Sequence, residues 1–382
     1  MIAYLDNSAT TRVCDAARER AVMMMQEEFG NPSSLHALGI RADREMTAAR
    51  RQVAGLLGLP SNGSELSAVT FTSGGTEANN LAIFGAAHAL KRRGKHLVTT
   101  AIEHPSVLEA MKALAQDGFE LTLVQPDANG DISADALVDA CREDTILVSA
   151  MLVNNELGTL LPIREAVPRI RKKSPLALIH CDAVQAAGKL PLKAAALGVD
   201  MMSISGHKLH APKGVGALYV KRSVRLIPRT YGGGQEKGLR SGTESTPLIA
   251  AFGAAIEALP PVPTQMAHFS ALRERLLDGL RSIDGTVPHL PANGVPYIVN
   301  VSVCGFKSET LVHFLAERGV FVSAGSACAK GHESHVLKAI GLPSAEIGSA
   351  LRISLCADNT PDEIDAFLDA LREAVTVLAR VQ

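Results

Sequence analysis

The chain has 382 residues and a formal net charge of −1; 47% of its residues are hydrophobic and only 4% are aromatic. A surface that binds polyanions needs a clustered excess of Lys and Arg, so this charge argues against nucleic acid as a direct substrate. The length fits a large domain with a smaller one attached, with cores built mainly from Ala, Val, Leu and Ile.

Neither a targeting segment nor a membrane-spanning segment is expected. The sequence from Met1 to Asp6 lacks a basic region followed by an apolar run, and no apolar stretch approaches the length that spans a bilayer. The six cysteines are scattered without the close spacing of a disulfide framework. This usage favours reduced thiols and a cytoplasmic location.

Apolar strand-like runs alternate with helical patterns in the first part of the chain. Strands are expected at 68–71, 96–100, 120–124, 146–152 and 177–181, with helices that begin at Thr76 and Pro105. This alternation is typical of an α/β fold in which helices cover a mostly parallel sheet.

The pattern changes near residue 260, where the proline-rich segment 260–263 is interpreted as a linker. A helix is expected through 272–280, followed by strands near 298–303 and 320–323. We therefore predict a large domain at 15–258 and a smaller α+β domain formed by 1–14 and 259–382.

The last helix has the clearest local signals. Thr360 can cap it, Pro361 suits the first turn, and Glu363 completes a capping box ahead of an apolar stripe. The stripe is interpreted as core packing.

The pairing of Lys208 with Asp182 indicates the chemistry. Lys208 ends the motif Ser205-Gly206-His207-Lys208, which is expected to lie on a turn near the surface of a cleft, and Asp182 ends an apolar strand. Pyridoxal phosphate needs a lysine to bind its aldehyde and a carboxylate beside its ring nitrogen. Taken alone, Lys208 would more often be an ordinary solvated surface lysine.

The segment Ser73-Gly74-Gly75-Thr76 joins an expected strand to a helix. Small residues and free amides at a helix N-terminus form a phosphate cup. The segment lacks the lysine of a nucleotide P-loop, which favours a monophosphate. A purely structural Gly-Gly turn is the alternative.

Two further polar residues follow strands whose carboxyl ends are expected at the same edge of the sheet. His104 could stack on a flat ring and move a proton there, and Asn155 could bond a phenolic oxygen. The alternatives are a half-buried histidine with a satisfied hydrogen bond and an ordinary loop asparagine.

Motifs distributed in order over nearly the whole chain resemble the cysteine desulfurases of the class-V aminotransferase group. They are Asp6 to Thr11, Gly30 to His36, Ser73 to Glu77, Glu103 to Pro105, Asn154 to Glu156, Asp182 to Gln185, Ser205 to Lys208, Arg240 to Thr243 and Ser326 to Cys328. The resemblance implies a PLP-dependent transferase fold of type I, with a seven-stranded, mostly parallel sheet and a smaller α+β domain.

The resemblance also implies roles. Lys208 would bind the cofactor aldehyde, Asp182 would pair with the ring nitrogen, His104 would stack on the ring, and Asn155 and Gln185 would serve the phenolic oxygen. The cofactor phosphate would be held by Gly75, Thr76, Ser205 and His207.

Three residues have implied roles beyond the cofactor. Arg352, helped by Asn31, would clamp the carboxylate of L-cysteine, because a planar guanidinium binds carboxylates through two hydrogen bonds. Thr243 would reach the phosphate in the partner subunit, which implies a homodimer.

Cys328 is expected to be the nucleophile that takes the sulfur of L-cysteine as a persulfide, leaving L-alanine. It follows the small residues 323–327 and is expected on a loop, where a thiol can ionise, whereas Cys141 and Cys181 lie in apolar sequence. Cys328, His332 and His335 match no common zinc spacing, so no metal is predicted.

The segment 329–337 is slightly shorter than in the long-loop desulfurases, which leaves open whether an iron-sulfur scaffold or a tRNA-thiolation relay accepts the sulfur. An aminotransferase or a selenocysteine lyase on the same fold remains an alternative activity. A non-catalytic scaffold that only binds an assembly partner is the alternative from another class.

Overall fold

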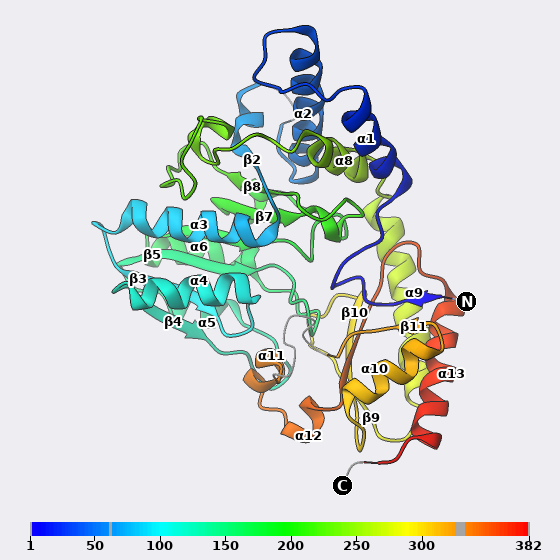
Figure 1. Ribbon diagram of the computed structural model, residues 1–382. Helices are drawn as coiled ribbons and strands as arrows, with labels where there is room; N and C mark the ends of the chain where they lie inside the picture. The colour runs from blue at the N-terminus through cyan, green and yellow to red at the C-terminus, as the bar shows by residue number, and fades with distance from the viewer. Residues whose placement is uncertain (1, 61–62, 325–332, 381–382) are drawn as a thin grey trace.

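The computed structural model describes residues 2–60, 63–324 and 333–380. Its largest element is a seven-stranded sheet, shown in Figure 1 between two layers of helices. The strand order is β2 (Val69–Thr72), β8 (Gly216–Val220), β7 (Met201–Ser205), β6 (Leu178–Asp182), β5 (Thr145–Met151), β3 (His96–Thr100) and β4 (Glu120–Val124).

The prediction of a mostly parallel sheet is confirmed. β8 is antiparallel to both of its neighbours, and the other neighbouring pairs are parallel. The expected strands at 96–100 and 120–124 are confirmed, and those at 68–71, 146–152 and 177–181 are each displaced by one residue.

Apolar side chains on both faces explain why this sheet is buried between helices. In β3, Leu97 packs with the core formed by α3 (Gly75–Leu90) and α4 (Pro105–Gln116), whereas Val98 packs with the core that includes α6 (Ile163–Lys173). Because successive side chains of a strand point to opposite faces, such a run needs cover on both sides.

Further helices complete these layers and extend beyond the sheet. Both α1 (Asp15–Gln26) and α2 (Ala37–Leu56) pack against α8 (Thr246–Glu257) beyond the β2 edge (Figure 1). The remaining short elements of this part are η1 (Gly63–Ala68), α5 (Ala134–Asp139), α7 (Ala194–Leu197), η2 (Gly206–Lys208) and η3 (Glu236–Gly238).

The second part contains a three-stranded antiparallel sheet of β12 (Ala350–Ser354), β10 (Ile298–Val303) and β9 (Thr286–His289). Its helices are α9 (Val262–Leu280), α10 (Ser308–Glu317), α11 (His335–Ala339), α12 (Ser344–Ile347) and α13 (Pro361–Val377). The expected strand at 298–303 is confirmed.

The expected linker at 260–263 is wrong in part, because α9 begins at Val262. Pro263 occupies its first turn, where the missing N–H of proline costs no helical hydrogen bond. The expected capping box is confirmed: Thr360 Oγ1 accepts from Glu363 N at 3.3 Å, and Thr360 N donates to Glu363 Oε2 at 2.8 Å.

The N-terminal segment runs between the two parts of the chain. β1 (Ala3–Tyr4) pairs in parallel with β11 (Val320–Phe321), which is shorter than the strand expected at 320–323. Ser354 N then donates to Leu5 O at 2.7 Å, so the following residues pass the end of β12. This path brings Ser8 and Ala9 to the edge of the large sheet.

No single helix among the described residues has the length and apolarity needed to cross a bilayer. The bent pair α8 and α9, at 76° to each other, meets those two criteria only when taken together.

Candidate active site

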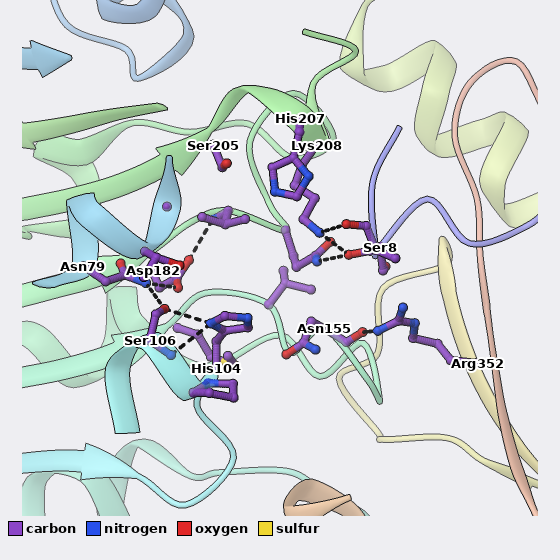
Figure 2. Close-up of a pocket in the computed structure, with 18 residues that line it drawn as sticks. Ser8, Asn79, His104, Ser106, Asn155, Asp182, Ser205, His207, Lys208 and Arg352 are labelled. Atoms are coloured by element: carbon purple, nitrogen blue, oxygen red, sulfur yellow. Dashed lines mark hydrogen bonds between the residues drawn. The ribbon is translucent and has the colours of Figure 1, made fainter. Parts of the chain in front are cut away.

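A cavity of about 250 Å³ lies at the carboxyl edge of the large sheet. The ends of β2, β3, β5, β6 and β7 and the strand β12 supply its lining (Figure 2). Ten of the residues expected at the site lie around it: Gly75, Thr76, His104, Asn155, Asp182, Gln185, Ser205, His207, Lys208 and Arg352.

Lys208 ends the short helix η2 between β7 and β8 and lines the cavity, as expected, although its side chain is only 9% exposed. Its Nζ donates to Ser8 O and Ala9 O, each at 2.5 Å. The N-terminal segment therefore covers the amine. Its two backbone carbonyls accept hydrogen bonds from Nζ and hold the amine beside the cavity.

The Asp182 carboxylate is held by two donors. Asn79 Nδ2 donates to Oδ2 at 2.7 Å, and Val184 N donates to Oδ1 at 2.9 Å. These two hydrogen bonds fix the orientation of the carboxylate. The cavity thus contains a fixed carboxylate that can pair with a protonated ring nitrogen.

The N-terminus of α3 opens onto the same cavity. Gly74 has φ +152° and ψ −176°, a backbone conformation that side chains disfavour, and a Cβ added at Gly75 would lie 2.9 Å from Val184 Cγ2. No side chain of residues 2–60, 63–324 or 333–380 caps this helix end. Its first amides are available to an anion, which the helix dipole also favours.

His104 caps α4 and has a defined tautomer. Ser106 N donates to His104 Nδ1 at 3.1 Å, so Nδ1 is an acceptor and the proton lies on Nε2. Burial lowers the pKa of His104, and the nearby Asp182 charge opposes this in part. The imidazole is consequently neutral at neutral pH and able to stack or exchange a proton.

His207 lies beside Lys208 and contacts the N-terminal segment, with Nδ1 at 3.3 Å from Thr10 Oγ1. Burial, followed by the positive charge of Lys208, lowers the pKa of His207 to about 4. A neutral imidazole here can donate to a phosphate without adding a charge.

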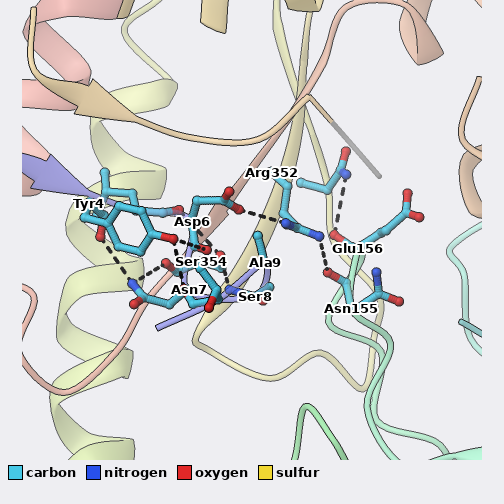
Figure 3. A network of polar contacts seen from close by, with 12 residues as sticks. Tyr4, Asp6, Asn7, Ser8, Ala9, Asn155, Glu156, Arg352 and Ser354 are labelled. Atoms are coloured by element: carbon cyan, nitrogen blue, oxygen red, sulfur yellow. Dashed lines mark hydrogen bonds and ion pairs between the residues drawn. The ribbon is translucent and has the colours of Figure 1, made fainter. Parts of the chain in front are cut away.

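Arg352 enters from the smaller sheet and is only 1% exposed (Figure 3). Arg352 Nη2 donates to Asp6 Oδ1 at 2.8 Å, and Arg352 Nη1 donates to Asn155 O at 3.1 Å. The Nε atom is buried and has no hydrogen-bond partner among the described residues. A buried guanidinium with an unused donor beside the cavity is suited to a carboxylate ligand.

Two buried amides add polar groups without partners. Gln185 Nε2 donates to Ser8 O at 3.0 Å. Within the described part of the chain, neither Gln185 Oε1 nor Asn79 Oδ1 has a hydrogen-bond partner. An amine, a carboxylate, an uncapped helix end and such amides together fit a polar aldehyde that carries a phosphate.

Not every expected residue lies at this cavity. Asn31 and Thr243 are exposed and do not line it, so their roles stay predictions. Cys328 and His332 lie outside the described residues, whereas His335 is described, with its Nε2 at 2.9 Å from Glu103 O. Cys141 and Cys181 are buried, as predicted.

The sequence reasoning missed Asn79, Ser106 and the backbone of Ser8 and Ala9, all of which line the cavity. Asn79 carried a usable signal, since it follows Thr76 by one helical turn and so shares its face of α3. The carbonyls of Ser8 and Ala9 gave no such signal in the sequence, because they meet Lys208 only through the tertiary path of the N-terminal segment.

Comparisons with known proteins agree with this geometry. Residues 3–367 match the family described as aminotransferase class-V. The chain is 39% identical to a protein of Clostridium botulinum named cysteine desulfurase IscS, over 97% of this chain and 94% of that one.

Solved structures resemble this chain over nearly its whole length. A structure titled NifS-like protein has a TM-score of 0.92 at 38% identity, covering 99% of this chain and 100% of its own. A structure titled SspA in complex with cysteine has a TM-score of 0.81 at 35% identity, covering 92% and 98%.

Proposed function

Since this chain belongs to the class-V aminotransferases, and within them to the cysteine desulfurases, we propose that it converts L-cysteine to L-alanine and passes the sulfur to an acceptor. The observation that carries the proposal is the convergence of Lys208, Asp182 and the uncapped α3 N-terminus on one cavity, with buried Arg352 beside it.

Pyridoxal phosphate is the cofactor that these residues fit, and when bound it withdraws electrons from the Cα of an amino acid. Lys208 would bind it covalently, and Asp182 would hold the charge on its ring nitrogen. The phosphate would lie on the amides of Gly75 and Thr76, with hydrogen bonds from Ser205 and His207. His104 would stack on the ring, and Asn155 and Gln185 would bond the phenolic oxygen.

Arg352 would position the substrate. Its Nε–H and the remaining N–H groups would take the cysteine carboxylate, while Asp6 and the Asn155 carbonyl hold the guanidinium in place. Lys208 and His104 are the groups at the cavity that can accept the Cα proton and return a proton to the product.

Cys328 would receive the sulfur. Its thiolate would attack the sulfur of the bound cysteine, forming an S–S bond as the Cβ–S bond breaks. The electron pair released from that bond would take up a proton at carbon, giving L-alanine and the Cys328 persulfide. This step is balanced in atoms and electrons and needs no external oxidant. An iron-sulfur scaffold or a tRNA-thiolation relay would then accept the terminal sulfur of the persulfide.

We also propose a homodimer. Large apolar side chains are exposed along α1, its connection to α2, and α2 itself: Val22, Met25, Phe29, Leu35 and Ile40. Exposed apolar patches of this kind mark association surfaces. Thr243, exposed and outside its own cavity, would then serve the site of the partner subunit.

The test is alanine production from L-cysteine by the purified holoenzyme, with and without a thiol reductant. Cys328→Ala is compared with Cys304→Ala, which removes a half-buried thiol outside the lining of the cavity. We expect alanine and sulfide from wild type and Cys304→Ala, and neither from Cys328→Ala, which should still bind the cofactor.

Other outcomes separate the alternatives. Alanine formation that survives Cys328→Ala would contradict the persulfide step and indicate lyase chemistry. A strict requirement for a keto acid would indicate an aminotransferase instead.

A further inference from the structure

Three potential metal ligands converge outside the cavity described above. One side-chain atom each from His210, Cys356 and Asp358 lies within 4.8 Å of the others. His210 follows Lys208 by two residues, and Cys356 follows β12, the strand that carries Arg352. The cluster therefore joins two segments that are far apart in sequence, each next to a residue of the candidate active site.

The imidazole of His210 is oriented by groups outside the cluster. The backbone of His210 has φ +58°, and its backbone N–H donates to Thr11 Oγ1 at 2.8 Å. Nδ1 lies 3.0 Å from the carbonyl of Arg12, which can only accept, so Nδ1 carries the proton. Nε2 is left with a lone pair. A backbone carbonyl on the other ring nitrogen is the usual support of a metal-binding histidine.

The sulfur of Cys356 is held by a turn of defined structure. Cys356 is 6% exposed, and Asn359 Oδ1 accepts from its N–H at 2.8 Å. Burial raises the pKa of the Cys356 thiol to about 11, and the backbone N–H groups of Asp358 and Asn359, which face the sulfur, oppose this shift in part. Asn359 Nδ2 in turn donates to Tyr4 O at 3.0 Å, which anchors the turn to the N-terminal segment.

We propose that His210 Nε2, Cys356 Sγ and an Asp358 carboxylate oxygen bind a zinc-type divalent cation. One soft sulfur, one imidazole and one carboxylate form a ligand set that zinc accepts, with water at the fourth position. Ligand atoms around tetrahedral zinc lie about 3.5 Å apart. The exposed Asp358 side chain can rotate to close the remaining distance, while the His210 ring stays on the Arg12 carbonyl.

The bound cation would clamp the segment after Lys208 to the turn after β12. It would hold the large sheet and the smaller sheet together behind the active site without entering the cavity. This role does not depend on the proposed reaction, so it can be tested by binding and stability alone.

The experiment uses holoenzyme with Cys328→Ser, so that the proposed nucleophile cannot bind the probe metal. Zinc is added, excess is removed by dialysis, and the metal content, the melting temperature and the zinc K-edge X-ray absorption are measured. Cys356→Ala and His210→Gln are compared with Cys304→Ala as the matched cysteine control.

We expect one zinc per chain with one sulfur at about 2.3 Å and lighter ligands at about 2.0–2.1 Å. The melting temperature should rise with zinc in this protein and in Cys304→Ala. Cys356→Ala should lose the sulfur ligand, and both cluster variants should bind zinc at least about tenfold more weakly.

A sulfur ligand that persists in Cys356→Ala would overturn the proposal, as would zinc bound without sulfur in the parent protein. The absorption spectrum of the parent decides this even if a cluster variant fails to fold. Failure of L-cysteine turnover would refute the proposed function but leave these binding results unaffected.

Discussion

Arg352 and Asp6, which are 346 positions apart in the sequence, form an ion pair of 2.8 Å at the edge of the candidate active site. The Arg352 side chain is almost fully buried, and the Asp6 side chain is 19% exposed. Removing one partner of a buried pair leaves an uncompensated charge, so Asp6 stabilises both the fold and the direction of the guanidinium. The Nε atom of Arg352 forms no hydrogen bond with any described residue.

Arg352→Lys should raise the KM for L-cysteine. An ammonium cannot present two parallel N–H donors, and a hydrogen bond to a charged group contributes roughly 1.5–3 kcal/mol, which corresponds to about tenfold to a hundredfold in KM. Steady-state alanine formation measures this. Arg318→Lys, which alters an arginine paired with Glu373 outside the cavity, is the control and should leave KM unchanged. An unchanged KM in Arg352→Lys would contradict the assigned carboxylate site.

Asn79→Ala should weaken cofactor binding about tenfold, because a lost hydrogen bond to a carboxylate costs on the order of 1.5 kcal/mol. Asn79 Nδ2 also donates to Ser106 Oγ at 2.9 Å, and Ser106 in turn contacts His104. The variant therefore removes one hydrogen bond from Asp182 and one from Ser106. Cofactor retention after dialysis measures the effect. Asn80→Ala removes the adjacent asparagine, which donates to Thr76 O and not to Asp182, and should retain the cofactor. Equal losses in the two variants would contradict the role of Asn79.

The buried Glu103 should lower the free energy of unfolding as the pH rises from about 4.5 to about 8. Burial, with a smaller contribution from Asp182, raises the pKa of Glu103 from 4.5 to about 8. Between these values the folded state keeps a proton that the unfolded state has released. The free energy of unfolding therefore falls by about 1.4 kcal/mol per pH unit, and this loss ends above the folded pKa.

Glu103→Gln tests this prediction, because glutamine does not titrate and can still accept from Thr100 Oγ1 and Met151 N through its oxygen. Melting temperatures are measured at pH 5 and pH 8. The decrease between them should be smaller in the variant than in wild type. Parallel decreases would show that Glu103 is ionised in the folded protein.

Thr360→Ala should lower the free energy of unfolding by about 1 kcal/mol, because it removes the side-chain half of the α13 capping box. Thermal unfolding measures the difference. Thr376→Ala is the matched control, since the Thr376 hydroxyl lies in the same helix and bonds Arg372 O within it. If both variants melt at the same temperature, the cap contributes nothing measurable.

Much of the fold was predictable from local patterns. β3, β4 and β10 begin and end where expected, since short runs rich in β-branched and apolar residues between turns are typical of strands. The start of α9 was missed because prolines indicate both linkers and first helical turns. The division into domains at 15–258 and the remainder stays a prediction.

The sequence by itself determined the chemical groups of the site, because Asp182 ends a strand, His104 and Gly75 each follow one, and parallel strands end at one edge. Only the tertiary structure decided what surrounds them. The N-terminal segment buries Lys208, Asn79 fixes Asp182, and Asp6 pairs with Arg352. These contacts join residues that are distant in the chain, and local propensity contains no information about which distant backbone carbonyl or side chain a donor will meet.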